Sequence, residues 1–412
     1  MQTGGGILRP LFCTVDGRAL GEDATMTPFG ERVRGVILGT AFGDALGAPV
    51  EKLSHDEIRQ RYGRVESLNT KWHKADWDAD RRLHRVRGNG IVTDDTLMTL
   101  ALVNVYQAKM RHIDAFDFAT AFIKEIAYRP CYIPEFGREA LIIDRLFYPE
   151  KYPFLRLSLA NCDPRDAGVG NMVNCGAAMY IAPVGVVNAC NPKAAYDEAI
   201  AFSSAHQSSY GLEAAGVLAA CIAQAFRPDA KPADLVETAL SLAKDGTHAA
   251  ILAIHRAAQE LKAAGADADT VVNRFHAVIR DYSPMGDDVN RSVERVGMPS
   301  NYYTPSRLFS IEELPIALGY IELHDGDLIP AICDGVNSGR DTDSIGAMIG
   351  SMLGALHGGR SLSEDVVQAL EEANRLNLVQ QADALAEAAR HIIGNDLSEN
   401  QKTAEHLRSI GL

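Results

Sequence analysis

The stretch GVILGTAFGDALG, residues 35–47, decides the fold because it repeats a glycine at every fourth position of an apolar segment. Residues four apart lie on one face of a helix, so these glycines form a smooth groove along which another backbone can approach closely. The stretch GAMIGSMLGALHG, residues 346–358, has the same spacing. Each interior glycine destabilises a helix by about 1 kcal/mol relative to alanine, so its repetition needs a packing reason. We therefore predict two helices that are buried on all sides.

Helical periodicity extends from these segments across nearly the whole chain, whereas period-two alternation is scarce. The pattern predicts helices over residues 31–47, 94–110, 114–127, 175–188, 193–205, 209–226, 232–244, 247–264, 268–280, 312–322, 342–357, 362–375 and 379–394. The predicted fold class is all-α. Because the sequence contains no internal repeat and no low-complexity linker, we expect one domain over residues 31–412, preceded by a loosely structured arm over residues 1–30.

Two proline-rich segments lack helical periodicity. Residues 128–170 are expected to form a mostly irregular insertion, and residues 283–306 a second irregular connection. Each is a candidate substrate-facing loop, and a surface insertion without function is the equal alternative.

Composition and charge exclude several classes of protein. The 412 residues carry a formal net charge of −14, which argues against binding to nucleic acid or to an anionic membrane surface. No stretch of about 18 apolar residues occurs, so no membrane span is predicted. The seven cysteines are scattered, without the spacing of a zinc site or a disulfide framework. We expect reduced thiols and a cytoplasmic location.

Two similar acidic clusters stand at the starts of apolar helices. Residues 93–96 read TDDT, and residues 341–344 read DTDS. Helix capping explains either cluster by itself. If the two helix starts converge, four carboxylates meet, and their repulsion raises the pKa of some of them. Two divalent cations would neutralise such a cluster. Because the available ligands are carboxylate and hydroxyl oxygens, they suit Mg²⁺, Mn²⁺ or Ca²⁺ rather than zinc.

The order of the sequence blocks resembles that of the ADP-ribosylglycohydrolase family. The blocks are GVILGTAFGDALGAPVE (35–51), GNGIVTDDT (88–96), NCGAAMYIAPVG (174–185), SSAHQSSYGLEAAG (203–216) and NSGRDTDSIGAMIGSMLGALHG (337–358). The TDDT and GRDTDS blocks are the specific ones. Together the blocks cover most of the span from residue 31 to residue 358.

This resemblance implies a compact all-α fold whose cleft holds two Mg²⁺ ions, with Mn²⁺ as the other candidate. The metal ligands that it implies are Thr93, Asp94, Asp95, Asp341, Asp343 and Ser344. It also implies that water attacks the anomeric carbon of an ADP-ribosyl group and cleaves its glycosidic bond. The partner would be an ADP-ribose-containing or ribosyl conjugate of a protein or small molecule. The resemblance gives catalytic roles to Asp343 and to Glu51, the latter as acid or base.

The glycine- and asparagine-rich block of the family implies contacts to the substrate. Gly170, Asn171, Asn174 and Gly176 are expected to let the pyrophosphate approach helix N–H groups, and capping is the alternative role of Asn174 and Gly176. His206 stands where the family often has a histidine near the substrate. A structural hydrogen bond is the alternative role of this histidine.

The resemblance also implies an adenine base in the substrate. An aromatic side chain from the two proline-rich segments is expected to stack on this base. The candidates are Tyr132, Phe136 and Tyr302, and the sequence does not choose among them.

The chain departs from many relatives at Cys175, Tyr180 and Arg340, where glycine, arginine and glycine are frequent. Because the first two fall near the expected phosphate or ribose contacts, a metal-dependent glycosidase or nucleosidase for another ribosyl substrate is the alternative function. A non-catalytic protein on the same fold, crystallin-like or ligand-binding, is the second alternative, and the four acidic residues argue against it. Arginine, serine, a nucleic-acid end and a metabolite are all compatible leaving groups, and no oligomeric state is predicted.

Overall fold

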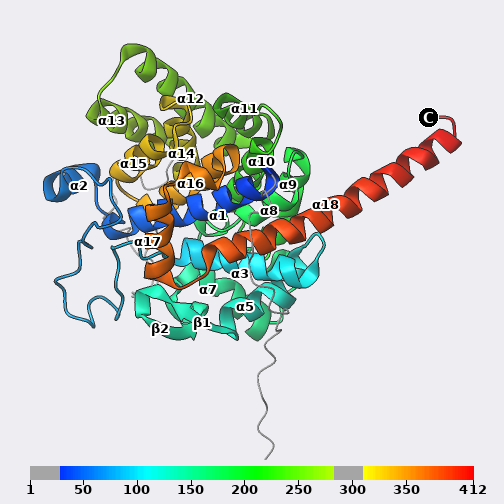
Figure 1. The fold of residues 1–412 in the computed structure, drawn as a ribbon, viewed down its shortest axis with the longest axis horizontal. Coiled ribbons are helices and arrows are strands. Elements are labelled where there is room, and N and C mark those ends of the chain that lie inside the picture. Colours follow the sequence, from blue (N-terminus) through cyan, green and yellow to red (C-terminus); the bar gives the residue numbers. More distant parts are fainter. Residues whose placement is uncertain (1–27, 283–309) are drawn as a thin grey trace, which may run out of the picture.

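The computed structural model describes residues 28–282 and 310–412, in which helices predominate (Figure 1). The longer helices are α1 (Pro28–Gly47), α2 (His55–Tyr62), α3 (Asp94–Lys109), α9 (Pro192–Ser203), α10 (Ser209–Ala225), α11 (Pro232–Leu242), α12 (Asp245–Ala264), α13 (Ala268–Ile279), α14 (Ser310–Leu323), α15 (Leu328–Asn337), α16 (Thr342–His357), α17 (Glu364–Asn374) and α18 (Leu378–Ser409). The shorter elements are α4 (Ala115–Asp117), α5 (Ile123–Ala127), α6 (Ile142–Arg145), α7 (Tyr148–Phe154), α8 (Ala182–Val187) and the antiparallel strands β1 (Pro130–Ile133) and β2 (Arg138–Leu141). The all-α prediction is confirmed.

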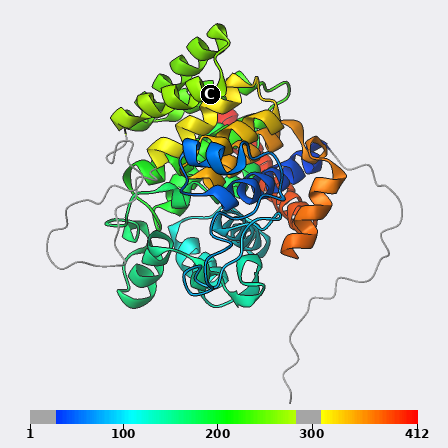
Figure 2. The same cartoon turned by 90° about the vertical axis from the view of Figure 1, so that its left-hand side faces the viewer.

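The two glycine-ladder helices, α1 and α16, pack directly on each other at the centre of the molecule in both views (Figures 1 and 2). Gly39 faces Gly350, and Gly43 faces Gly346, so the helices run antiparallel. A methyl group on Gly39 would overlap the carbonyl oxygen of Gly350, and one on Gly350 would overlap that of Gly39. The ladders therefore allow a backbone-to-backbone approach that no residue with a Cβ atom permits.

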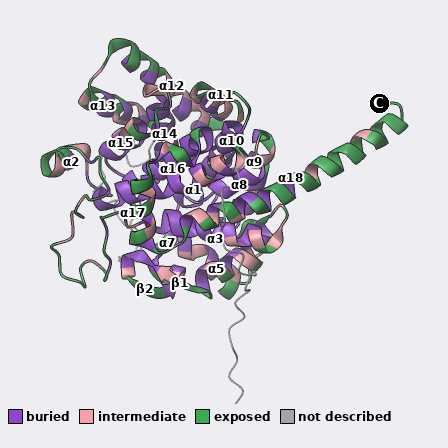
Figure 3. Cartoon of the chain, in the orientation of Figure 1, coloured by how far each residue is buried: buried purple, intermediate pink, exposed green. Residues whose placement is uncertain are grey.

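The other helices surround this pair and bury it. Helices α3, α15 and α18 pack against α1, while α10, α14 and α15 pack against α16. Buried residues accordingly concentrate on the central helices, and exposed residues lie on the outer ones (Figure 3). In the last part of α18 the helix leaves the body of the protein as an isolated rod (Figure 1). No helix among residues 28–282 and 310–412 combines the length and the hydropathy that a membrane crossing needs.

Several predicted boundaries need correction. The segment 128–170 is only partly irregular, because it contains the β1–β2 hairpin, α6 and α7. The helix predicted over 175–188 is divided into one 3₁₀ turn, Cys175–Ala177, and α8. Pro183 lies in the first turn of α8, where a residue without an amide hydrogen is tolerated, and this favours a new helix start. Helix α18 continues 15 residues beyond the predicted end at 394.

The helices α2 and α15 were not predicted. Helix α2 is mostly charged and buries only Ile58, so it lacks the apolar stripe that would reveal it. Most of the arm 1–30, and all of the connection 283–306 with Tyr302, lie outside the described residues. The single-domain boundary therefore stays a prediction. The six cysteines in the described part of the chain are free thiols.

Candidate active site

Asp44, on the glycine-ladder helix α1, holds the start of α3. Its Oδ2 accepts hydrogen bonds from the Thr93 N–H (2.9 Å), the Thr96 N–H (3.1 Å) and the Thr96 hydroxyl (2.6 Å). The side chain is completely buried. Burial raises the pKa of Asp44 to about 6, and the hydrogen bonds from Thr96 and Thr93 oppose a larger rise. Asp44 thus fixes the TDDT turn relative to the central helix pair.

The structure brings the two acidic helix starts together. Asp341 and Asp343, at the start of α16, each have a carboxylate oxygen within 4.8 Å of the other and of a Glu51 oxygen. Asp95, at the start of α3, is close enough for its charge to raise the pKa of Asp343. Burial is the larger cause, and with the neighbouring carboxylates it raises the pKa values of Asp95 and Asp343 well above the ordinary range. These groups repel one another in a buried place.

The three remaining predicted ligands lie around the same cluster. The Thr93 hydroxyl is 3.4 Å from Asp95 Oδ2 and in position to donate to it. The Ser344 hydroxyl belongs to the first turn of α16 and is buried. Asp94 forms an ion pair with Arg145, whose side chain is completely buried. The sequence therefore singled out a set of residues that are spatial neighbours, and their role as metal ligands stays a prediction.

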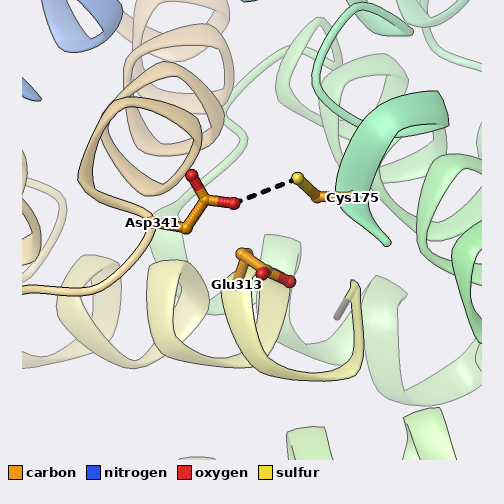
Figure 4. Close-up of side chains that lie close together, drawn as sticks. All are labelled: Cys175, Glu313 and Asp341. Atoms are coloured by element: carbon orange, nitrogen blue, oxygen red, sulfur yellow. Dashed lines mark hydrogen bonds between the residues drawn. The ribbon is translucent and has the colours of Figure 1, made fainter. Parts of the chain in front are cut away.

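Cys175 joins this cluster from the other side. Its Sγ, a Glu313 oxygen and an Asp341 oxygen lie within 4.8 Å of one another, as the close-up in Figure 4 shows. The thiol donates a 3.2 Å hydrogen bond to Asp341 Oδ2 and lies 3.5 Å from the Ser344 hydroxyl. Burial, reinforced by the charge of Asp341, raises the pKa of Cys175 well above its ordinary value. The side chain is therefore a neutral thiol. It fills space that a glycine at this position would leave empty.

The cluster fits a hard divalent cation. Among the described residues, Asp95 Oδ1 is buried without a hydrogen-bond partner. A buried carboxylate oxygen is costly unless a cation or a water molecule compensates its charge. The donors around it are mainly carboxylate and hydroxyl oxygens, which Mg²⁺ and Ca²⁺ prefer. The cluster thus has both a reason to bind a metal ion and suitable atoms to do so.

Glu51 is anchored at the edge of the cluster by a buried arginine. Arg87 pairs with Glu51 through Nη1, and the same nitrogen lies 3.8 Å from Asp343 Oδ2. The side chain of Glu51 is 11% exposed, so it borders the buried carboxylates without being enclosed. Burial acts to raise the pKa of Glu51, but the charges of Lys52 and Arg87 hold it well below its ordinary value. Glu51 is therefore a carboxylate held in one position.

A second acidic side chain, Glu135, ties the two buried arginines together. Its Oε1 accepts a 2.7 Å hydrogen bond from Arg87 Nε, and its Oε2 pairs with Arg145. Glu135 is completely buried in the 3₁₀ turn between β1 and β2. Through these contacts the insertion that contains the hairpin supports both the Asp94 side and the Glu51 side of the cluster.

The predicted substrate loop lies against the Asp94 side. Asn174 caps the turn that follows it, since its Oδ1 accepts a 3.0 Å hydrogen bond from the Gly176 N–H. Its Nδ2 donates to Glu150 Oε1 at 3.1 Å. A Cβ atom on Gly176 would lie 2.5 Å from the same Glu150 oxygen, so a larger residue here would require the Glu150 side chain to move. Burial, together with the charge of Asp94, raises the pKa of Glu150 to about 7.

Gly170 and Asn171 shape the beginning of this loop. Gly170 has a φ of +87°, a conformation that favours glycine. Asn171 is 7% exposed, and its Nδ2 donates to the carbonyl oxygens of Pro149 (2.7 Å) and His206 (2.8 Å). The amide of Asn171 is thus engaged inside the protein. Contact of these two residues with a substrate stays a prediction.

His206 lies in the core, where it makes the kind of structural hydrogen bond that is the alternative to a substrate contact. It is completely buried, its Nδ1 lies 2.8 Å from the Tyr180 hydroxyl, and the two rings stack with centroids 5.7 Å apart. Burial lowers the pKa of His206 to about 3, so the ring is neutral. Tyr180 is equally buried. Of the departures from the family pattern, Cys175 therefore contacts the acidic cluster, whereas Tyr180 belongs to the core.

Arg340 also has a local explanation. Its φ is 72°, in the left-handed region that favours glycine. Its N–H donates to the carbonyl oxygen of Leu53 at 2.7 Å, and its guanidinium pairs with Glu312 at 2.8 Å.

Of the candidate adenine-stacking residues, Tyr132 lies under the guanidinium of Arg375 and Phe136 beside that of Arg138.

Sequence reasoning missed the charged residues that support the cluster, namely Arg87, Arg145, Glu135 and Glu313. Two of them carried a usable signal. Arg87 immediately precedes the GNG turn that leads into TDDT, and Glu313 is part of a Glu-Glu pair in an otherwise apolar helix. Arg145 and Glu135 lie in the proline-rich insertion, where no periodic pattern marks them as buried.

Comparisons with known proteins agree with this architecture. Residues 25–395 match the sequence profile of the ADP-ribosylglycohydrolase family. The chain is 25% identical to the uncharacterised protein YegU of Escherichia coli (strain K12) over 365 residues, which are 86% of this chain and 96% of that protein. It is 32% identical to the ADP-ribosyl-[dinitrogen reductase] glycohydrolase of Rhodospirillum rubrum over 145 residues, 35% of this chain and 42% of the relative.

A solved structure described as an ADP-ribosylglycohydrolase-related protein complex has the same fold, with a TM-score of 0.56 and 20% identity. The alignment covers 88% of this chain and 99% of the other. The members of the family are glycosidic hydrolases. Because the profile spans most of the sequence, the chain belongs to the ADP-ribosylglycohydrolase family.

Proposed function

We propose that this protein hydrolyses the glycosidic bond at the anomeric carbon of an ADP-ribosyl group, with two Mg²⁺ ions as cofactors. One observation carries the proposal: two acidic helix starts, far apart in the sequence, meet in a buried cluster that includes the unpartnered Asp95 Oδ1. The residues that would hold the ions are Thr93, Asp94, Asp95, Asp341, Asp343 and Ser344. Mn²⁺ has the same preference for oxygen and is the alternative ion.

The bound ions would supply positive charge that orients the ribose hydroxyl groups and lowers the pKa of a bound water molecule. The protein's own side chains supply the rest. The Glu51 side chain is 11% exposed and is fixed by an arginine, so it is placed to accept a proton from the attacking water. Arg87 positions Glu51 and keeps its carboxylate from turning away.

Glu150 accepts a hydrogen bond from Asn174 and lies close enough to Asp94 to feel its charge, so the loop that contains Asn174 and Gly176 lies next to the cluster. This loop is the candidate support for the pyrophosphate, because the N–H groups of a turn that starts with a capping asparagine point toward an approaching anion. The ribose would then lie between this loop and Glu51.

The test is release of ADP-ribose from a panel of ADP-ribosylated proteins and small molecules in magnesium buffer, with plain ribonucleosides as a parallel arm. We expect release from at least one ADP-ribosyl conjugate, and loss of about 10²-fold or more in kcat for Glu51→Gln. The matched control is Glu66→Gln, because Glu66 is exposed and pairs with Arg64 at the surface. Cleavage of a nucleoside without cleavage of any ADP-ribosyl conjugate would replace the proposal with a nucleosidase.

A further inference from the structure

A basic pocket of about 160 Å³ opens beside Glu51. Its lining contains a single acidic residue, Glu51, and six cationic ones. The cationic residues are Lys52, Lys74, Arg81, Arg82, Arg85 and Arg87. In a chain with a formal net charge of −14, such a concentration of positive charge opposes the average of the molecule. The described residues do not provide a partner for this surplus of cations.

Most of these cations have no carboxylate partner within the described ranges 28–282 and 310–412. Arg87 pairs with Glu51 and Glu135, and Lys52 lies 3.4 Å from Glu51. The other four form no ion pair. Arg85 is only 7% exposed, donates from Nη2 to the Arg145 carbonyl oxygen, and leaves its Nε buried without a hydrogen-bond partner.

Arg82 and Lys74, like Arg85, lack an ion-pair partner among the described residues. The Nε of Arg82 is also buried without a hydrogen-bond partner. Lys74 has its ammonium 5.4 Å from the ring centroid of Trp77 and 6.0 Å from that of Trp72, so aromatic faces rather than carboxylates hold it. Burial lowers the pKa of Lys74, since nothing in its surroundings fully compensates its charge. Lys74 and Arg82 are half-buried, and cations in such places without a carboxylate partner are typical of a site whose counter-ion is a ligand.

Aromatic rings keep the cations in the pocket. The ammonium of Lys52 lies 5.0 Å from the centroid of the Phe147 ring, and the Arg85 guanidinium 4.8 Å from the same ring. Arg81 lies 4.7 Å from the centroid of Trp77. Cation–π contacts fix the direction of these side chains without neutralising their charge. The pocket is therefore positively charged and also built of ordered side chains.

Glu51 and Arg87 connect the pocket to the acidic cluster. Both line the pocket, and both approach Asp343. Residues 168–176, the candidate pyrophosphate loop, do not line it. If the proposed function holds, the anomeric carbon lies near Glu51, and the group attached to this carbon extends toward the basic pocket rather than toward the loop.

We propose that the basic pocket receives the leaving group of the conjugate, and that this leaving group is an anion of the phosphate class rather than the guanidinium of an arginine. A guanidinium would bring a further positive charge among six cations. A phosphate would meet the positive charges of Lys74, Arg81, Arg82 and Arg85, which form no ion pair within the described ranges 28–282 and 310–412. The inference rests on the proposed function for its direction, while the binding of an anion by the pocket can be measured independently.

The corresponding reaction is balanced without a further reactant. The bond between the anomeric carbon and the phosphate oxygen breaks, and its electron pair leaves with the phosphate. The oxygen of water bonds to the same carbon, and the proton that water loses ends on the phosphate. ADP-ribose 1″-phosphate and water thus give ADP-ribose and inorganic phosphate, and this compound is the appropriate probe.

The experiment compares ADP-ribose 1″-phosphate with ADP-ribosyl-arginine as substrates of the full chain in magnesium buffer. The variants are Lys74→Gln and Arg82→Gln, and the control is Lys71→Gln, which removes an exposed cation of the same loop that pairs with Asp76 outside the pocket. We expect the wild type to prefer the phosphate. Either pocket variant should lose roughly tenfold in kcat/KM for the phosphate, the size expected of one hydrogen bond to a charged group. ADP-ribosyl-arginine should show no such loss.

A second measurement, calorimetric titration with inorganic phosphate, does not depend on turnover. We expect the wild type and Lys71→Gln to bind phosphate and both pocket variants to bind it roughly tenfold more weakly. Equal phosphate binding by wild type and pocket variants, or faster hydrolysis of the arginine conjugate by the wild type, would overturn the inference. If neither conjugate is hydrolysed but phosphate binding depends on Lys74 and Arg82, the hydrolase proposal fails and the anion site stands.

Discussion

The Thr96 hydroxyl donates a 2.6 Å hydrogen bond to the carboxylate of Asp44, and this contact joins the start of α3 to the glycine ladder of α1. Asp44 does not belong to the predicted ligand set, yet it fixes the backbone from which Asp94 and Asp95 project. Its effect on a metal ion is therefore indirect, and it is open to a specific test.

Asp44→Asn should weaken Mg²⁺ binding by roughly 10- to 100-fold, the loss typical of partners that orient a metal ligand. The asparagine would present an amide N–H to a place where Asp44 accepts two N–H groups and a hydroxyl. Calorimetric titration with Mg²⁺ measures the change. Asp56→Asn, at an exposed site on α2, is the control, and unchanged affinity in Asp44→Asn would show that the clamp is unimportant.

Mg²⁺ should stabilise the wild-type protein, and Asp95→Asn should abolish the effect. A ligand at about 100 times its Kd adds about 2.7 kcal/mol to the free energy of unfolding. Without metal, Asp95→Asn should be at least as stable as the wild type, because it removes one of several repelling buried carboxylates. Thermal unfolding with EDTA and with excess Mg²⁺ gives the stability of the wild type and of Asp95→Asn, each with and without the metal ion. A metal-free variant clearly less stable than the metal-free wild type would contradict this account of the cluster.

Gly39→Ala should lower the free energy of unfolding by about 3 kcal/mol or more, because its methyl group would overlap the backbone of Gly350. Gly394→Ala, in the outer part of α18, is the matched control, since a Cβ atom there meets nothing within 4 Å. It should raise the stability by up to about 1 kcal/mol through helix propensity. Denaturant unfolding of the two variants should therefore give changes of opposite sign.

His112 should make stability depend on pH at the junction of α9 and α18. Its Nδ1 lies 2.6 Å from Glu198 and its Nε2 2.9 Å from Asp396. The hydrogen bond to Glu198 raises the pKa of His112 to about 9 from 6.5, although burial acts in the other direction. Because the folded-state pKa is the higher one, the stabilisation is complete below pH 6.5 and disappears as the pH rises through about 9.

His112→Gln should thus reduce the melting temperature at about pH 6 and have little effect at about pH 10. The measurement is the difference in melting temperature between wild type and variant across this range. His84→Gln, which replaces an exposed histidine, is the control. A His112→Gln difference that is constant with pH would mean that the imidazole contributes only packing.

The sequence alone predicts the central helix pair because the period of its glycines reports directly on a helix face and on close backbone approach. The acidic residues of the site were also accessible, since Asp95 and Asp343 follow their turns at recognisable helix starts. The contribution of the hairpin around Glu135 could not be predicted from the sequence. That glutamate is buried because it pairs with Arg145, 10 residues away, and with Arg87, 48 residues away. Such a partnership exists only after the chain has folded, and no local pattern encodes it.

The basic pocket, like the hairpin around Glu135, is a feature that no local sequence pattern reveals. Apart from Lys52, its arginines and lysines lie within residues 74–87, where a charge run ordinarily indicates a solvated surface. The structure shows that Arg85 and Arg87 are buried, and their neighbours converge on one cavity. Burial of charge is a tertiary property, so the sequence could not distinguish this run from an exposed one.

The contact between Gly39 and Gly350 has a consequence for how the family can vary. The atoms that would meet a new methyl group belong to the backbone of the opposite helix, and every residue type has the same backbone. A substitution in one ladder therefore has no compensating substitution in the other, unlike a pair of packed side chains whose volumes can be exchanged. Each ladder position is consequently constrained on its own, and pairs across the central helices should show invariance rather than covariation.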